Sequence, residues 1–232
     1  MIDAGSKGAQ AIAAAMEEYR AGDYESALAT LAQTTVDEEH YLDLAYLLGL
    51  CYARLGRWDE ALLYLEQVVT QGEDGSRTSQ CRMMLAFVYS STGRSKLAEY
   101  ELQKLVDASR ETTQVCAALG HANWKLGRLD EGLRWYRKAL DIDSDNPTAL
   151  NGYGYLLACA DRDLEVALSY CRKALDSDPK NPAYADSMGF VCLKLGKLDA
   201  AAQYLKAASQ ILGDNEEIQE HMLAYEKAAL ET

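Results

Sequence analysis

Proline and long apolar runs are scarce in this 232-residue sequence, and each of these absences excludes some classes of fold. Only 3 prolines occur, which suits uninterrupted helices because proline breaks a helix interior. No stretch approaches the roughly 20 consecutive apolar residues of a membrane helix, so we expect no membrane span. The first eight residues lack the charged-then-apolar layout of a signal peptide. These absences favour a cytoplasmic protein; a periplasmic or membrane-anchored location is the alternative if an upstream signal has been removed.

Residues that carry metal or catalytic chemistry are also few. The sequence holds 3 histidines and contains no HExxH, GxSxG or P-loop pattern. Its 6 cysteines form no CxxC pair and lie in apolar helical patterns, where free cysteine behaves as a small buried hydrophobe. Cys116 and His121 share one helical segment, but their separation suits one helix face poorly. We therefore expect no metal, no cofactor and no enzymatic activity.

Basic residues are outnumbered, with 23 Lys and Arg against 36 Asp and Glu and a net charge of −13. A phosphate backbone would be repelled by this charge, so we expect no nucleic-acid binding. The acidity is concentrated in residues 1–75, which hold 14 acidic and 4 basic side chains. One interpretation is a docking surface for a basic partner. The other is a solvated acidic surface that keeps the protein in solution.

A small residue followed by an apolar helix face recurs every 34 to 37 residues. The recurring positions are Ala27, Ala61, Ala98, Gly132, Ala167 and Ala201. Five of them are preceded, five residues earlier, by a glycine: Gly22, Gly56, Gly93, Gly127 and Gly196. Glycine ends a helix because it reaches the left-handed conformation at little cost. The period therefore predicts tandem pairs of short antiparallel helices that share one core.

The segments AYLLGLCYARLGRWDEALLYLEQ and NPAYADSMGFVCLKLGKLDAAAQYLKAA closely resemble the tetratricopeptide repeat family, in particular its bacterial members. The resemblance implies an all-α, right-handed α-α superhelix of six helix-turn-helix repeats with a C-terminal capping helix. The expected parts are a disordered N-terminus (1–7), repeats at 8–41, 42–75, 79–112, 113–146, 147–181 and 182–215, and the capping helix (216–232). The implied function is a non-enzymatic scaffold that binds a protein or peptide partner.

Two places depart from the regular repeat. The 37-residue gap comes from residues 71–77, which we interpret as a longer loop, with a hinge as the alternative. In the fifth repeat, residues 159–163 replace the turn glycine and carry one extra residue. This insertion predicts a shift in helical register.

The resemblance places a concave partner-binding groove at fixed positions of each first helix. These positions hold Ile12, Met16, Tyr46, Leu50, Met83, Phe87, His121, Trp124, Asn151, Tyr155, Asp186 and Phe190. Such a surface is richer in aromatic and methionine side chains than a solvated face, which is typical of binding sites. The alternative is that the inner wall packs on itself. Two polar residues of this set, Asn151 and Asp186, either form hydrogen bonds to a peptide backbone or brace neighbouring helices.

Several functions are compatible with such a groove. The leading hypothesis is an adaptor that binds an amphipathic helix or an extended peptide. The alternatives are a self-assembling structural subunit, and thus a homo-oligomer, or an accessory protein of an envelope or transport assembly. One subclass of the family clamps a peptide's terminal carboxylate with lysine and asparagine. The matching positions here are apolar or aromatic, so we expect no clamp.

Overall fold

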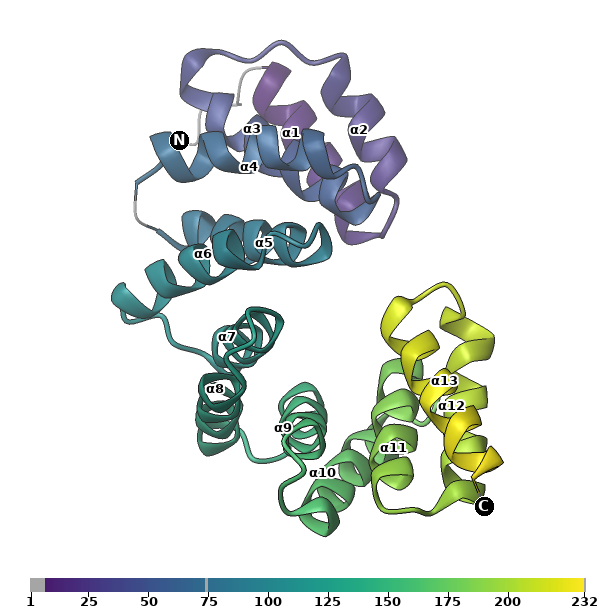
Figure 1. Ribbon diagram of the computed structural model, residues 1–232. Helices are drawn as coiled ribbons and strands as arrows, with labels where there is room; N and C mark the ends of the chain where they lie inside the picture. Colours follow the sequence, from purple (N-terminus) through teal and green to yellow (C-terminus); the bar gives the residue numbers. More distant parts are fainter. Residues whose placement is uncertain (1–6, 74, 232) are drawn as a thin grey trace. The chain divides into compact units, whose positions relative to one another are not determined.

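The structure, a computed structural model, describes residues 7–73 and 75–231, and over these residues it is helical without a strand (Figure 1). The helices are α1 (Lys7–Arg20), α2 (Tyr24–Ala32), α3 (Tyr41–Arg54), α4 (Trp58–Gln71), α5 (Ser76–Ser91), α6 (Ser95–Asp107), α7 (Thr113–Lys125), α8 (Leu129–Ile142), α9 (Pro147–Cys159), α10 (Leu164–Ser177), α11 (Pro182–Lys194), α12 (Leu198–Leu212) and α13 (Glu216–Leu230), with a short 3₁₀ helix, η1 (Glu38–His40), before α3. The predicted all-α fold of repeated helix pairs is confirmed. None of the described helices has both the length and the apolar character needed to cross a membrane.

The chain divides into two compact units at Arg110 and Glu111. Unit 1 contains α1–α6, and unit 2 contains α7–α13. The division does not fall in the segment 71–77, because α4 and α5 on either side of that segment pack together. That segment therefore joins two packed helices inside unit 1.

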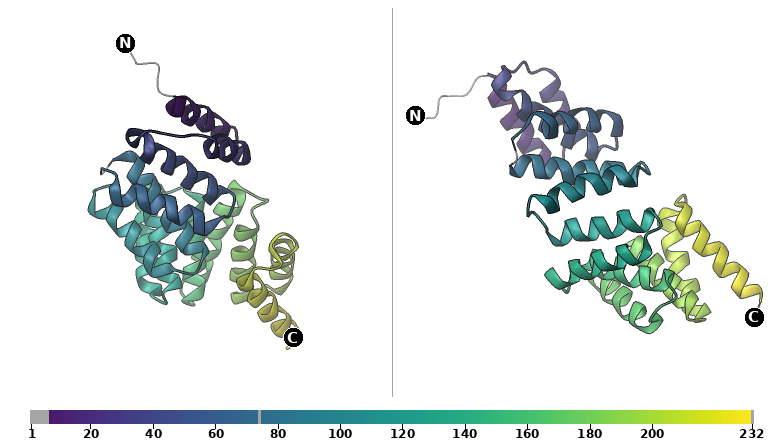
Figure 2. Two further views of the ribbon diagram at one scale, coloured as in Figure 1. Left: turned by 90° about the horizontal axis from the view of Figure 1, so that it is seen from above. Right: turned by 60° about the vertical axis from the view of Figure 1, so that its left-hand side comes forward.

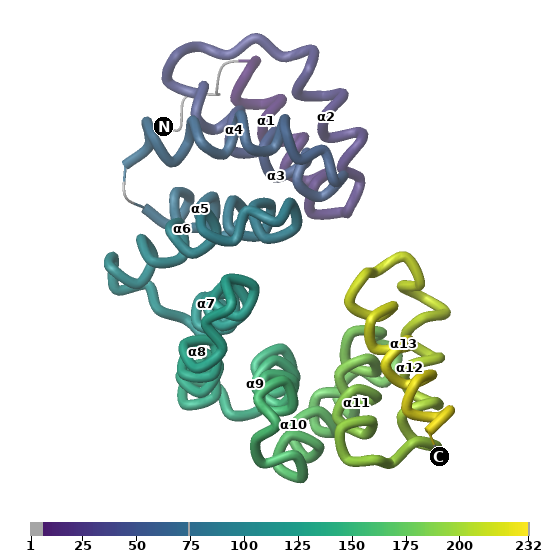
Figure 3. The backbone as a smooth tube through the Cα atoms, in the orientation of Figure 1, coloured from purple at the N-terminus to yellow at the C-terminus, as the bar shows by residue number. Residues whose placement is uncertain are grey.

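In unit 1, the helices pack as the consecutive pairs α1/α2, α3/α4 and α5/α6, joined by the short turns traced in Figure 3. The first helices of the pairs, α1, α3 and α5, also contact one another in that order. Figure 2 shows the same stacking order from two further sides. Each first helix is thus covered by its own partner on one side and by the neighbouring first helices on others.

Unit 2 repeats this arrangement with the pairs α7/α8, α9/α10 and α11/α12. The first helices α7, α9 and α11 again pack in order, and α13 packs on both α11 and α12. The last helix therefore takes the place that a further first helix would occupy.

Two predicted limits differ from the helix bounds. Lys7, which was expected in a disordered N-terminus, begins α1, and residues 76–78, which were expected between two repeats, begin α5. Residues 1–6 lie outside the described part, and the division into six repeats stays a prediction.

The recurring small residues are the points at which helices approach closely. Ala27, Ala61 and Ala98 in unit 1 are completely buried. At Gly49 of α3, an added Cβ would lie 2.7 Å from the Leu65 side chain of α4, so only glycine fits. Gly189 has the same relation to Leu205, at 2.6 Å, in the α11/α12 pair. The period in the sequence is thus the period of these contacts.

The extra residue of the fifth repeat lies in the turn between α9 and α10, which has four residues, 160–163. The corresponding turns of the other helix pairs have three residues, as between α11 and α12 at residues 195–197. Asp161 and Asp163 take left-handed conformations there, with φ of 49° and 44°. Ala167 remains completely buried, as Ala201 does in the next pair. The predicted register shift is therefore wrong: the turn, and not the helix, absorbs the insertion.

Candidate partner-binding surface

In unit 1, one of the six predicted groove residues is buried, four are partly buried and one is exposed. Leu50 is buried, while Ile12 and Met16 are partly buried and pack against the apolar cluster around Ala15 and Leu47. Ile12 and Met16 thereby help to hold α1 against α3. At these positions the structure has the self-packed inner wall that the sequence leaves open as an alternative.

The α5 end of unit 1 is different, because an aromatic ring projects into solvent. The Phe87 residue is 53% exposed, and its ring meets only the edge of Trp58 among the described rings, with 5.9 Å between centroids. Met83, one turn earlier, is partly buried. Tyr46 on α3 donates its hydroxyl hydrogen bond to Gln80 of α5, so it braces the two first helices. Phe87 is thus the most accessible of the predicted groove residues in unit 1.

In unit 2, the predicted residues form a continuous row of rings across three first helices. The His121 and Trp124 rings of α7 lie 5.4 Å apart, and Trp124 meets Tyr155 of α9 edge-on at 5.3 Å. The Tyr155 ring then lies 5.4 Å from Phe190 of α11. Ring pairs at these separations add to the burial energy of their side chains. The row therefore fixes the spacing of α7, α9 and α11.

Helix α13 inserts His221 into the end of this row. The imidazole stacks on Phe190 at 4.3 Å, and its Nε2 lies 3.3 Å from the Tyr155 hydroxyl. Its Nδ1 donates to the Asp186 carboxylate at 2.9 Å, where His221 is 6% and Asp186 is 5% exposed. Asp186, predicted either to contact a peptide or to brace helices, therefore braces α11 against α13.

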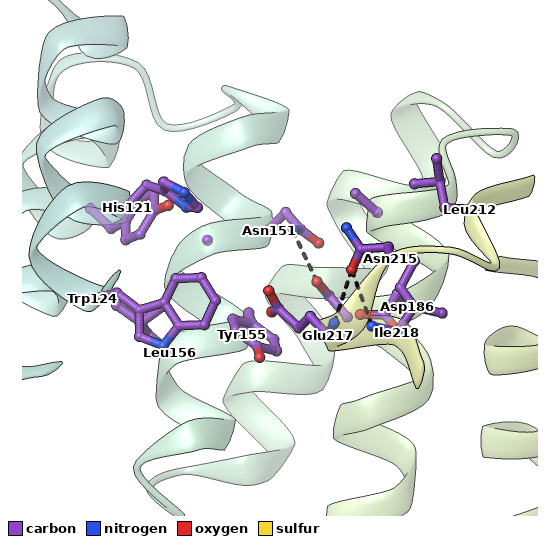
Figure 4. A pocket seen from close by; sticks show the side chains of 14 residues that line it. His121, Trp124, Asn151, Tyr155, Leu156, Asp186, Leu212, Asn215, Glu217 and Ile218 are labelled. Carbon is purple, nitrogen blue, oxygen red and sulfur yellow. Dashed lines mark hydrogen bonds between the residues drawn. The ribbon is translucent and has the colours of Figure 1, made fainter. Parts of the chain in front are cut away.

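Next to this row the surface opens into a cavity of about 190 Å³ (Figure 4). Its walls include Trp124 and Tyr155 from the ring row, Asn151 of α9 and Glu217 of α13. Asn151 donates through Nδ2 to Ser187 Oγ at 3.0 Å, which braces α9 against α11. In Figure 4 the Glu217 side chain reaches from the start of α13 towards the rings. The cavity is thus mixed in character, with aromatic walls and oxygen acceptors.

Five residues predicted from the sequence lie on the cavity wall: His121, Trp124, Asn151, Tyr155 and Asp186. The wall residues that α13 and α8 supply are not among those predicted. Glu217 and Ile218 come from the segment expected only to cap the last repeat, and Tyr136 comes from a second helix. One signal was available: Ile218, His221, Met222 and Tyr225 follow the spacing of a buried helix face. A histidine in such a row points into the protein.

His121, on the cavity wall, has a pKa below the usual value of an imidazole. Burial lowers the pKa of its imidazole, the nearby Lys125 lowers it further, and Glu217 opposes both. When the pKa of a histidine is lower in the folded protein than in the unfolded chain, the unfolded chain binds the proton first as the pH falls. The contribution of that histidine to the free energy of unfolding is therefore fully present above the unfolded pKa of about 6.5 and is lost as the pH falls below it. Acidification should therefore favour the unfolded chain, which takes up the proton more readily.

We expect the His121→Gln variant to lose less stability than the wild type between pH 7.5 and pH 5.5. Glutamine keeps a polar side chain without titrating over this interval. The midpoints of urea unfolding at the two pH values measure the difference. An equal acid-induced drop in both proteins would show that His121 does not contribute.

Two buried thiols of unit 1 are held in the protonated form. Burial raises the pKa of the Cys51 and Cys81 thiols to about 12, so both stay protonated at neutral pH. Across residues 7–73 and 75–231, no three His, Cys, Asp or Glu side chains gather in a way that could hold a metal ion.

Comparison with family models gives matches to the tetratricopeptide repeat over residues 12–76, 84–147 and 117–182. Together the matches cover more than half of the chain. A search of curated proteins found no match.

Several solved structures are similar. MamA from Desulfovibrio magneticus RS-1 (residues 41 to the end) is 22% identical with a TM-score of 0.65, covering 74% of this chain and 95% of that one. PilW, described as a widely conserved type IV pilus biogenesis factor, is 18% identical with a TM-score of 0.72, covering 94% of this chain and 100% of that one. YrrB, described as a protein with an unusual peptide-binding site, is 20% identical with a TM-score of 0.53, covering 79% and 91%. At these identities the likeness shows the fold.

Proposed function

Because the chain belongs to the tetratricopeptide repeat family, whose members typically hold other proteins and catalyse no reaction, we propose that it is a non-enzymatic scaffold. It binds a peptide or helix of a partner protein on the surface that the first helices form within each unit. In unit 1 this surface is centred on Phe87, and in unit 2 it is the cavity beside the ring row.

The exposed Phe87 ring is the observation that carries the proposal. A large aromatic ring left half in water has a free-energy cost that a binding partner removes. It lies on a first helix, where the family binds its partners, and not on the outer helix of its pair. Aromatic side chains that become desolvated on binding also contribute most to interface energies.

Charge indicates what kind of segment would bind. The acidic excess of residues 1–75 favours a basic segment through long-range attraction. The similarity to YrrB, whose structure is described as having a peptide-binding site, supports a peptide ligand. A short segment with basic residues and at least one apolar anchor meets both requirements.

The proposal is tested by partner capture with Phe87→Glu. We expect this change to weaken capture at least tenfold, because a carboxylate in a desolvated contact is strongly unfavourable. Leu97→Glu is the matched control: Leu97 is 46% exposed on α6, the second helix of the same pair. Quantitative mass spectrometry of proteins retained by the wild type and both variants gives the comparison. Equal loss in the two variants, or no loss with Phe87→Glu, would contradict the proposal.

A second candidate is an accessory subunit of an envelope assembly, favoured by the similarity to PilW along its whole length. Cell fractionation separates this candidate from the cytoplasmic location that we predict. A third, self-assembly through the same surface, requires concentration-dependent mass in light scattering. A strict monomer would remove it.

A further inference from the structure

The cavity of unit 2 has a chemical polarity that a purely apolar peptide groove would not need. On one side its walls are the Trp124 and Tyr155 rings, and on the other they are the oxygens of Asn151 and Glu217 (Figure 4). Its volume of about 190 Å³ is below the 300–1,000 Å³ typical of sites for whole small molecules. A cavity of this size suits one long side chain.

One oxygen on the cavity wall is an acceptor without a donor. The Asn151 Oδ1 atom is buried and has no hydrogen-bond partner among the described residues, while the amide nitrogen of the same side chain is used by Ser187. A buried acceptor without a donor has a free-energy cost, which a donating ligand removes. The second acceptor, Glu217, is a carboxylate, so an anionic ligand would be repelled. The cavity therefore favours a ligand that donates hydrogen bonds and carries positive charge.

The protein already places one cation of its own next to these walls. The ammonium of Lys125 lies 4.1 Å from the centre of a Trp124 ring and 3.2 Å from Glu217 Oε2. An indole face and a carboxylate together stabilise a cation more than either does alone. The Lys125 side chain is 43% exposed, so it can leave at little cost when another cation arrives. This contact shows which kind of group the wall attracts.

We propose that this cavity binds an arginine side chain of the partner segment. The guanidinium stacks on Trp124, pairs with Glu217 in place of Lys125 and donates to Asn151 Oδ1. Arginine fits better than lysine, because its planar group stacks on rings and offers several donors in a fixed geometry while being more weakly hydrated. The inference rests on the proposed function, since the arginine belongs to the bound partner, and it adds a residue requirement to that partner.

The test uses N-acetyl-arginine methylamide as the probe, with the citrulline derivative as a neutral control of nearly the same shape. Binding is followed by NMR from the indole N–H signal of Trp124, which is assigned by its disappearance in Trp124→Phe. We expect a saturable shift with the arginine probe and at least fivefold weaker binding of the citrulline probe. Lys125→Met should tighten binding of the arginine probe, because the competing cation is gone.

Glu217→Gln should weaken binding of the arginine probe at least fivefold, whereas Glu220→Gln, on the exposed side of α13, should leave it unchanged. Thermal unfolding of both variants shows whether they are folded. Equal binding of the two probes, unchanged binding to Glu217→Gln, or no shift of the Trp124 signal would each overturn the inference. If Phe87→Glu still abolishes partner capture in that case, the proposed function stands and only the arginine site falls. If the arginine probe binds as expected but the Phe87→Glu variant captures the partner normally, the arginine site stands and the proposed function falls.

Discussion

Replacing His221 with alanine is expected to lower the free energy of unfolding by about 3 kcal/mol. The change removes the donor that satisfies the Asp186 carboxylate, and it leaves that carboxylate buried without a partner. It also removes the ring that stacks on Phe190 and meets Tyr155. Urea unfolding followed by far-ultraviolet circular dichroism measures the loss.

A double-mutant cycle distinguishes the loss of the hydrogen bond between His221 and Asp186 from a simple loss of packing. In the His221→Ala background, Asp186→Ala should lower the free energy of unfolding much less than it does in the wild type. In that background the Asp186 carboxylate is already unpaired, so its removal takes away an unfavourable buried charge. Glu220→Ala, on the exposed side of the same helix, should change stability by less than about 0.5 kcal/mol. Strictly additive effects of the His221 and Asp186 changes would contradict the pairing.

Gly152→Ala is the second change with a large expected effect, a loss of about 2 kcal/mol. The buried Tyr136 ring of α8 lies against two glycines, Gly120 of α7 and Gly152 of α9. A methyl group at Gly152 would lie 2.2 Å from Cε1 and Cζ of that ring. The ring has little room to move away, because a Cβ at Gly120 would already be 2.7 Å from its other edge.

Shortening the ring should rescue this change if overpacking is the cause. Tyr136→Leu is expected to be less harmful in the Gly152→Ala background than in the wild type. As a control, Gly75→Ala should be tolerated within about 0.5 kcal/mol, because its nearest heavy atom would be 3.8 Å away. Equal costs of Tyr136→Leu in both backgrounds would place the cause elsewhere.

The helical pairs could be predicted from the sequence because their physical requirements are local and repeated. Small residues such as Ala61 and Ala201 are needed where two helices touch, and glycines such as Gly56 are needed where a helix must end with a positive φ, here 70°. Both recur with the repeat. The turn at residues 160–163 could not be predicted in the same way, because Asp161 and Asp163 adopt the left-handed conformation without a sequence signal as clear as glycine.

The candidate site was only partly predictable, because family positions report where a side chain starts and not what covers it. Phe87 and Leu50 occupy the same position in successive repeats, yet one is exposed and the other is buried. Tyr155 and Asp186 became interior because α13 brings His221 against them. Such contacts between distant segments have no period, so repeat spacing does not reveal them.

Site-specific photo-crosslinking tests the central claim, that a partner binds on the first helices, most directly. A photoreactive phenylalanine analogue is placed at position 87 on α5 or at position 97 on α6, two exposed positions of one helix pair. After irradiation in the presence of the captured partner, the account predicts a crosslinked partner from position 87 and almost none from position 97. Crosslinking from position 97 with none from position 87 would contradict it.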